Sequence, residues 1–154
     1  MYSNLLAIHS LIRWMVVGSL FFSIFRAYYG WLLQRPFTRY DNLVRHWTAT
    51  IAHIQLIVGL WLYIISPIVA YFLGHIKTAM QERAIRFFGI EHITMMLIGI
   101  ILITLGSARA KRETTDKEKF KTIAIWYTIG ALVILSSVPW SFSPVVSRPN
   151  FRPF

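Results

Sequence analysis

The stretch between Arg86 and Arg109 constrains the fold of this chain more than any other. It is an apolar run whose only strongly polar side chains are the adjacent Glu91 and His92. A helix of about twenty apolar residues spans the ~30 Å hydrocarbon core of a bilayer. A carboxylate and an imidazole inside such a run lose hydration that lipid cannot replace, so they must find partners within the protein. The sequence therefore predicts a transmembrane helix that carries a polar site.

Nearly the whole chain divides into four apolar segments joined by short charged connections. It is 56% hydrophobic and only 14% charged, whereas a soluble domain is about 25% charged. We therefore predict an all-α membrane protein in which residues 1–154 form a single domain. Four transmembrane helices are expected in an up-down-up-down bundle, at about 5–31, 43–66, 79–108 and 122–140.

Capping signals suggest where two of these helices begin. Asp41 and Asn42 end a polar connection and are expected to cap the second helix. Thr78 and Gln81 have the spacing of a capping box, which predicts that the third helix begins at about Ala79. Pro67 is expected to end or kink the second helix.

The distribution of basic residues predicts the orientation of the bundle. The net charge is +10, and most of the lysines and arginines lie around the first and third connections. The positive-inside tendency then places both termini on the non-cytoplasmic side. Because these charges sit between apolar segments instead of along one face, we do not expect nucleic-acid binding. The chain has no cysteine, which excludes a disulfide, a thiolate metal site and an iron–sulfur cluster within it.

Polar residues of the first and third helices are expected at matching depth. Both helices would enter from the outer face, which puts His9, Arg13, Glu91 and His92 about 6–12 Å below the surface. Since first and third helices lie diagonally in such a bundle, His9 and His92 would face each other. His53 lies near the midplane and is the competing partner, one or two helical turns deeper.

Two interpretations compete for these histidines. In the functional one, His9, His53 and His92 supply axial ligands to a haem between the helices. In the structural one, each imidazole donates a hydrogen bond to a neighbouring helix. A metal without porphyrin, bound by the three histidines with Glu91 or Met96, is a further alternative. Thioether and imidazole ligands favour copper, and a carboxylate favours a harder ion.

Arg13 and Glu91 have opposite charges at matching depth, which predicts an ion pair between the first and third helices. Such a pair would remove two uncompensated charges from the bilayer and fix the helix register. In a functional version, Arg13 binds a haem propionate or a quinone carbonyl. Glu91 then orients an imidazole or relays protons.

The motifs that contain these residues resemble a known family. They are His9-Ser10-Leu11-Ile12-Arg13-Trp14, His53-Ile54-Gln55 followed by Gly59 and Tyr63, Glu91-His92-Ile93 with Met95-Met96, and Pro139-Trp140. Over nearly the whole chain they are similar to small bacterial four-helix membrane proteins described as cytochrome b-like. The resemblance implies a b-type haem protein of the bacterial inner membrane, with ligands at His9, His53 and His92.

These observations lead to two hypotheses about function. The first is a cytochrome subunit with haem b that passes electrons between a partner protein and the quinone pool. Because its loops are too short to process a large substrate, it is expected to work with other membrane subunits or as a homo-oligomer. The second is a cofactor-free accessory subunit that stabilises a larger membrane complex. A metal or proton channel would require more polar pore-lining positions than this sequence offers.

Overall fold

The computed structural model describes residues 1–143, 146, 148 and 149, and this part of the chain is helical with no strand. Four helical stretches are long and apolar enough to cross a membrane. They are α1 (Tyr2–Leu32), α2 (Arg39–Ile65), the continuous run Arg83–Arg112, and α7 (Asp116–Ser136). The run Arg83–Arg112 consists of α5 (Arg83–Arg86), the π-helix η1 (Phe87–Glu91) and α6 (His92–Arg112). The predicted all-α fold with four spans is confirmed.

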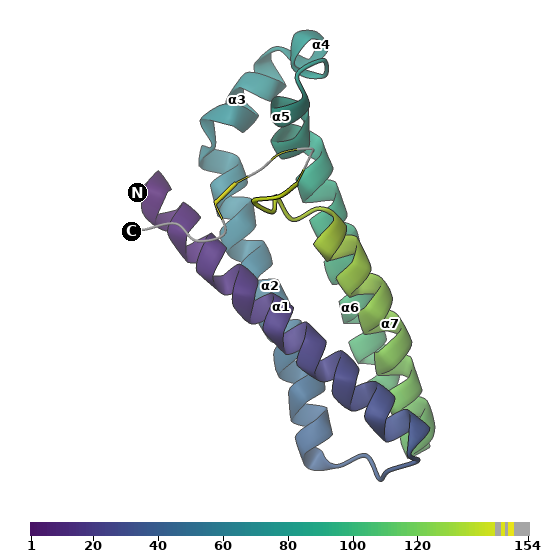
Figure 1. Cartoon of the computed structure of the whole chain (residues 1–154). Helices are drawn as coiled ribbons and strands as arrows, with labels where there is room; N and C mark the ends of the chain where they lie inside the picture. The colour runs from purple at the N-terminus through teal and green to yellow at the C-terminus, as the bar shows by residue number, and fades with distance from the viewer. Residues whose placement is uncertain (144–145, 147, 150–154) are drawn as a thin grey trace.

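The long helices pack in a closed ring, as an up-down-up-down bundle requires. α1 packs on α2, α2 on α6, α6 on α7, and α7 on α1. This order places α1 and α6 at opposite corners. Figure 1 shows α1 running beside α7 at one end of the bundle and diverging from it toward the N-terminus.

Small residues bring α6 and α7 into close contact. A Cβ atom on Gly99 would lie 2.5 Å from Ile134, and one on Gly130 would lie 3.1 Å from the Gly99 carbonyl oxygen. Such close backbone approach is the usual way for transmembrane helices to gain packing energy, since lipid tails are as apolar as the side chains. Next to this contact, Ile103 and Tyr127 are completely buried.

The outer surface of the bundle is strongly apolar. More than half of the surface of several large side chains remains exposed, among them Phe25, Ile57, Ile64, Ile101 and Leu132. A soluble monomer rarely exposes apolar surface on this scale. Lipid contact accounts for it, and the chain therefore has the architecture of a multi-pass membrane protein.

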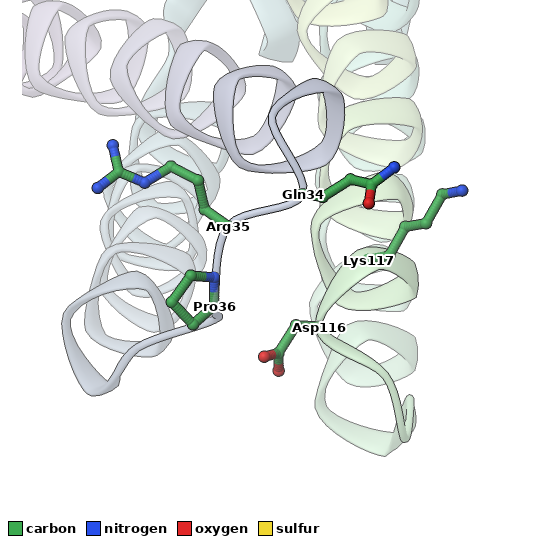
Figure 2. Close-up of a pocket in the computed structure, with 5 residues that line it drawn as sticks. All are labelled: Gln34, Arg35, Pro36, Asp116 and Lys117. Atoms are coloured by element: carbon green, nitrogen blue, oxygen red, sulfur yellow. The ribbon is translucent and has the colours of Figure 1, made fainter.

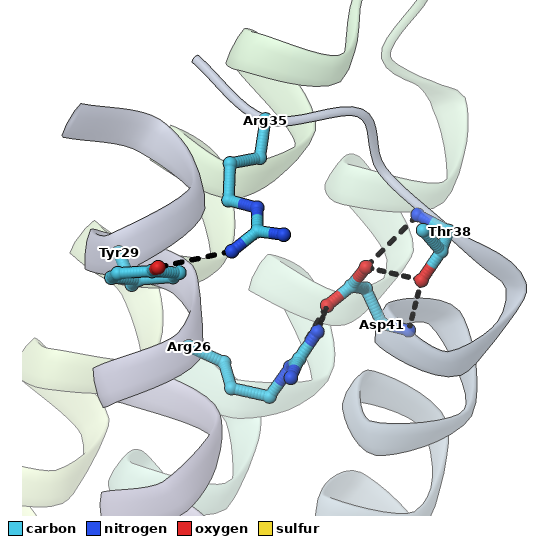
Figure 3. A network of polar contacts seen from close by, with 5 residues as sticks. All are labelled: Arg26, Tyr29, Arg35, Thr38 and Asp41. Atoms are coloured by element: carbon cyan, nitrogen blue, oxygen red, sulfur yellow. Dashed lines mark hydrogen bonds and ion pairs between the residues drawn. The ribbon is translucent and has the colours of Figure 1, made fainter. Parts of the chain in front are cut away.

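α2 begins one turn earlier than predicted because Thr38, and not Asp41 or Asn42, is its N-cap. The Thr38 hydroxyl accepts from the Asp41 backbone N–H (3.4 Å), and the Asp41 carboxylate accepts from the Thr38 backbone N–H (2.9 Å). This is a capping box with aspartate in the third position. The same carboxylate accepts a hydrogen bond from Arg26 Nε (2.9 Å), which ties the end of α1 to the start of α2 (Figure 3).

The segment between α2 and the third span is broken into short helices. The Ser66 hydroxyl caps α3 (Pro67–Gly74), and Pro67 occupies the first turn, where its missing N–H has no cost. α4 (Ile76–Ala79) follows. The predicted start of a continuous third helix at Ala79 is wrong, because that residue ends α4 and the span begins at Arg83. α3, α4 and α5 gather at one end of the bundle (Figure 1).

α7 occupies residues 116–136 instead of the predicted 122–140. Thr115 caps it, accepting from the Glu118 backbone N–H at 3.3 Å, so the first turn lies within the charged connection. The helix ends three residues before Pro139, a residue that cannot continue the backbone ladder. α1 and α2 end close to their predicted positions. The side of the membrane on which the termini lie stays a prediction.

Candidate cofactor site

A cavity of about 340 Å³ lies among α1, α2, α6 and α7, near the end of the bundle that carries α3. Side chains such as Val16, Leu56, Ile100 and Ile134 form its apolar walls. Its polar lining consists of Tyr2, His9, Ser10, Arg13, Gln55, Tyr63, Ser66, His92 and Arg148. Apolar walls with a few converging polar groups, at this volume, are typical of small-molecule and cofactor sites.

His92 is the first residue of α6 and lines the cavity. Its Nδ1 lies 2.8 Å from the backbone carbonyl oxygen of Ser137, just beyond the end of α7. A carbonyl can only accept, so Nδ1 carries the proton and Nε2 keeps its lone pair. Metal-ligating histidines usually have this arrangement, in which the other ring nitrogen is fixed by a carbonyl or carboxylate. His92 is therefore oriented to offer Nε2 to a ligand.

His9 lines the same cavity from α1 and rests against α2. The Gln55 side-chain amide donates to the His9 backbone oxygen (2.9 Å) and lies 3.3 Å from His9 Nε2. Because the amide nitrogen donates, Nε2 accepts and the ring proton is on Nδ1. Gly59 leaves room for the His9 ring beside α2, because a Cβ atom on residue 59 would lie only 3.1 Å from His9 Cε1.

Two buried polar atoms beside the cavity have no hydrogen-bond partner among the described residues. They are His9 Nδ1 and Gln55 Oε1. An unsatisfied buried polar atom costs about 1–3 kcal/mol, so native proteins leave few of them. Both atoms can therefore form hydrogen bonds with a molecule in the cavity.

His53 does not reach the cavity. Its Nδ1 lies 2.7 Å from the Ala49 carbonyl oxygen and its Nε2 lies 3.1 Å from the Thr104 hydroxyl on α6. One ring nitrogen of His53 thus contacts its own helix, and the other contacts α6 through Thr104. The structure brings two of the three candidate ligands together, His9 and His92. Within the described part of the chain, no three His, Cys, Asp or Glu side chains are grouped to hold a metal ion, so the alternative three-histidine site is not formed.

The pairing predicted between Arg13 and Glu91 is corrected by the structure. Glu91 Oε1 lies 2.6 Å from Arg86 Nε. The backbone N–H of His92 bonds to the Phe87 carbonyl, five residues back, which is the π-helical pattern. In this wider turn, residues five apart lie nearly above one another, so Arg86 reaches Glu91 along the same helix. Depth alone could not reveal this local partner.

Arg13 lies instead on the wall of the cavity. It donates to the Ser10 hydroxyl at 3.3 Å, and its guanidinium carbon lies 5.5 Å from the Trp14 ring centroid and 5.9 Å from that of Trp140. Aromatic faces stabilise a cation in surroundings of low polarity. The guanidinium is thus positioned beside the cavity without the predicted contact to Glu91.

Arg148 is a lining residue that sequence reasoning missed. Its guanidinium carbon lies 5.0 Å from the Phe88 ring centroid. Arg148 itself belongs to no helix, so no helical periodicity relates it to the bundle. No acidic side chain belongs to the described lining of the cavity. Arg13 and Arg148 contribute two guanidinium groups to this lining, and guanidinium groups bind ligands with anionic groups.

The π-helix also shapes the end of the cavity nearest α3. The Tyr63 hydroxyl donates to the Gly89 carbonyl oxygen at 2.7 Å, and Tyr63 lines the cavity. Gly89 allows Phe72 of α3 to pack directly on the π-helix, because a Cβ there would lie 2.3 Å from the Phe72 ring. π-turns within α-helices are frequent at functional sites. Gly89, which lies three residues before His92, therefore contacts both Phe72 of α3 and Tyr63 of α2.

A second cleft, of about 290 Å³, lies at the opposite end of the bundle and is lined by Gln34, Arg35, Pro36, Asp116 and Lys117. Figure 2 shows the side chains of Arg35 and Lys117 extending away from each other. This cleft contains no histidine, and its charged groups do not converge. The cavity between His9 and His92 is therefore the stronger candidate for a cofactor site.

Comparison of the chain with models of known protein families, with curated proteins and with solved structures gives no match. What the site binds must therefore follow from its own chemistry.

Proposed function

We propose that this chain binds haem b between His9 and His92 and passes electrons between a partner protein and the quinone pool. In this proposal it is a subunit or homo-oligomer of the bacterial inner membrane. The observation that carries the proposal is the pair of imidazoles, contributed by helices at opposite corners, on the wall of one cavity. Two axial histidines from separate helices are a common way for helix bundles to bind haem.

The described residues fit the chemistry of this group. His92 offers Nε2 while its Nδ1–H bonds to the Ser137 carbonyl, which makes the imidazole a stronger ligand. His9 also has its lone pair on Nε2, next to the Gln55 amide. That amide has to turn aside for His9 to bind iron, and it would lose a contact of 3.3 Å, longer than a normal hydrogen bond.

Charge and polarity agree with the same assignment. Arg13 and Arg148 would bind the two propionates of the haem, and the apolar walls would surround the porphyrin. A bound haem would supply one-electron chemistry that no side chain of this protein provides. The protein's own contribution is to orient the imidazoles, to neutralise the carboxylates and to exclude water.

The experiment is a reduced-minus-oxidised absorption spectrum of the protein purified from cells with ample haem. We expect a b-type Soret and α band in the wild type. His92→Ala and His9→Ala should abolish or shift the bands. His53→Ala is the matched control, because that ring lies between α2 and α6, and it should leave them in place. Absence of the bands in folded wild-type protein would refute the proposal and favour a cofactor-free accessory subunit.

A further inference from the structure

The C-terminal end of α1 carries a cation beside exposed aromatic rings, at the opposite end of the bundle from the cavity. The backbone N–H of Arg35 bonds to the Gly30 carbonyl oxygen at 3.0 Å, and Gln34 has a φ of 49°. This is the pattern of a Schellman motif, which reverses the chain directly after a helix. Arg35 is thereby turned back toward the last turns of α1, and its side chain lies beside Tyr29 (Figure 3).

Tyr29 fixes the position of the Arg35 guanidinium. The Arg35 Nη1 donates to the Tyr29 hydroxyl at 3.0 Å, and the guanidinium carbon lies 5.1 Å from the Tyr29 ring centroid. Phe25, one turn deeper along α1, stacks on the Tyr29 ring with centroids 6.3 Å apart and planes inclined by 12°. Phe25 is 70% exposed and Tyr29 is 45% exposed. A fixed cation therefore lies next to two stacked rings that face away from the bundle.

Arg35 forms no ion pair with an acidic side chain in the part of the chain that the structure describes. Asp41, which belongs to the same network, is buried and accepts from Arg26 Nε at 2.9 Å (Figure 3). Asp116 lines a cleft together with Arg35, but its carboxylate lies 3.7 Å from Lys119 Nζ. Figure 2 shows the Arg35 side chain directed away from Asp116. The charge of Arg35 is therefore available to an anion from outside the chain.

The length of α1 places this surface in the headgroup layer of a bilayer. The helix has 31 residues and is therefore about 46 Å long, whereas the hydrocarbon core is only ~30 Å thick. The end of α1 thus extends beyond the apolar layer, to the level where tyrosine is enriched in membrane proteins. From this level inward, the surface presents a guanidinium, a hydroxyl and two aromatic rings. A phospholipid presents its phosphate and its acyl chains in the same order.

We propose that Arg35, Tyr29 and Phe25 bind one anionic phospholipid of the surrounding bilayer. The Arg35 guanidinium donates charge-assisted hydrogen bonds to the phosphodiester oxygens, and an acyl chain lies along the rings of Tyr29 and Phe25. One uncompensated positive charge matches a headgroup with a single net negative charge, such as phosphatidylglycerol. A zwitterionic headgroup carries its own cation beside the phosphate, which repels the guanidinium. This site does not depend on a haem in the cavity.

The test is native mass spectrometry of the protein in micelles that contain equal amounts of phosphatidylglycerol and phosphatidylcholine with identical acyl chains. We expect the wild type to retain one phosphatidylglycerol in preference to phosphatidylcholine. Arg35→Gln should lower the ratio of the two bound lipids about tenfold, because charge-assisted hydrogen bonds to the phosphate are lost. Arg35 is exposed and lies outside the helices, so circular dichroism should show an unchanged helix content in this variant.

Arg112→Gln is the matched control for a general effect of removing a cation. Arg112 is exposed and ends α6 just before Asp116, which lies in the same cleft as Arg35. The control should change the lipid ratio by no more than about twofold, because salt screens a charge that does not contact the lipid.

Three results would overturn the proposal. The first is a wild type that retains both lipids equally, and the second is an equal loss in Arg35→Gln and Arg112→Gln. The third is displacement of the bound lipid by excess inorganic phosphate, which would indicate a site for free anions. None of these results bears on haem binding, because the cavity lies at the other end of the bundle.

Discussion

Removal of the Asp41 carboxylate should destabilise the bundle measurably. Asp41 is 5% exposed, and its side chain accepts from the Thr38 backbone and hydroxyl and from Arg26 (Figure 3). One carboxylate therefore completes the capping box of α2 and joins this helix to α1. Asp41→Ala removes both interactions. Asp41→Asn keeps one oxygen for the Thr38 backbone N–H, but it replaces the oxygen that accepts from Arg26 with an NH2 group, which cannot accept a hydrogen bond.

The size of the effect follows from these two interactions. Loss of the hydrogen bond from the Thr38 backbone N–H to the Asp41 carboxylate costs about 1 kcal/mol. The hydrogen bonds to Arg26 are charge-assisted, but the Arg26 side chain is 37% exposed, which reduces their contribution to about 1 kcal/mol through solvent screening. We expect the free energy of unfolding to fall by about 2 kcal/mol in Asp41→Ala and by about 1 kcal/mol in Asp41→Asn.

The assay is reversible unfolding of the purified protein in mixed micelles, followed by circular dichroism as a denaturing detergent is added. Asp116→Asn is the matched control, because Asp116 is in the first turn of α7 and pairs with Lys119 at 3.7 Å with 47% of its side chain exposed. It should change stability by less than about 0.5 kcal/mol. Equal losses in Asp41→Asn and Asp41→Ala, or a loss in either no larger than in Asp116→Asn, would refute this reasoning.

Two further predictions concern the π-helix and use the same unfolding assay. Gly89→Ala should lower the free energy of unfolding by about 1–3 kcal/mol through overpacking against Phe72, and adding Phe72→Leu should restore part of this loss. Gly18→Ala is the control, because a Cβ at Gly18 would meet nothing within 4 Å, and it should not destabilise the protein. Equal losses at both glycines would contradict the packing explanation. Arg86→Glu should lower the free energy of unfolding by no more than about 1 kcal/mol, because solvent screens an ion pair whose two side chains are each about one-third exposed. Adding Glu91→Arg should restore most of this loss. No recovery in the double variant would show that the two side chains do not interact.

The large features of the fold were predictable because they depend on length and composition. Four apolar segments with short connections leave few arrangements other than an up-down-up-down bundle. That arrangement places the first and third helices diagonally, so His9 and His92 could be expected to face each other from depth alone. Both do line one cavity in the structure. The apolar character of α1 and α2 likewise defined their ends to within a few residues.

The errors have a common cause, which is that depth along a helix does not specify direction around it. The sequence pattern predicts a regular α-helix from Ala79 for the third span, whereas the structure contains the π-helix Phe87–Glu91. A π-turn inserts a residue and rotates all that follows. Glu91 consequently pairs with Arg86 and not with Arg13. His53 shows the same limit, since its depth was compatible with a haem while its ring is directed at Thr104.

The central claim is that His9 and His92 are the two axial ligands of a single haem. Electron paramagnetic resonance of the oxidised protein tests it directly, because the spectrum distinguishes a low-spin iron with two imidazoles from other ligand sets. We predict a bis-imidazole spectrum in the wild type and in His53→Ala, and loss of that spectrum in His9→Ala and in His92→Ala. A wild type without haem, or a bis-imidazole spectrum that survives His92→Ala but disappears in His53→Ala, would contradict the account.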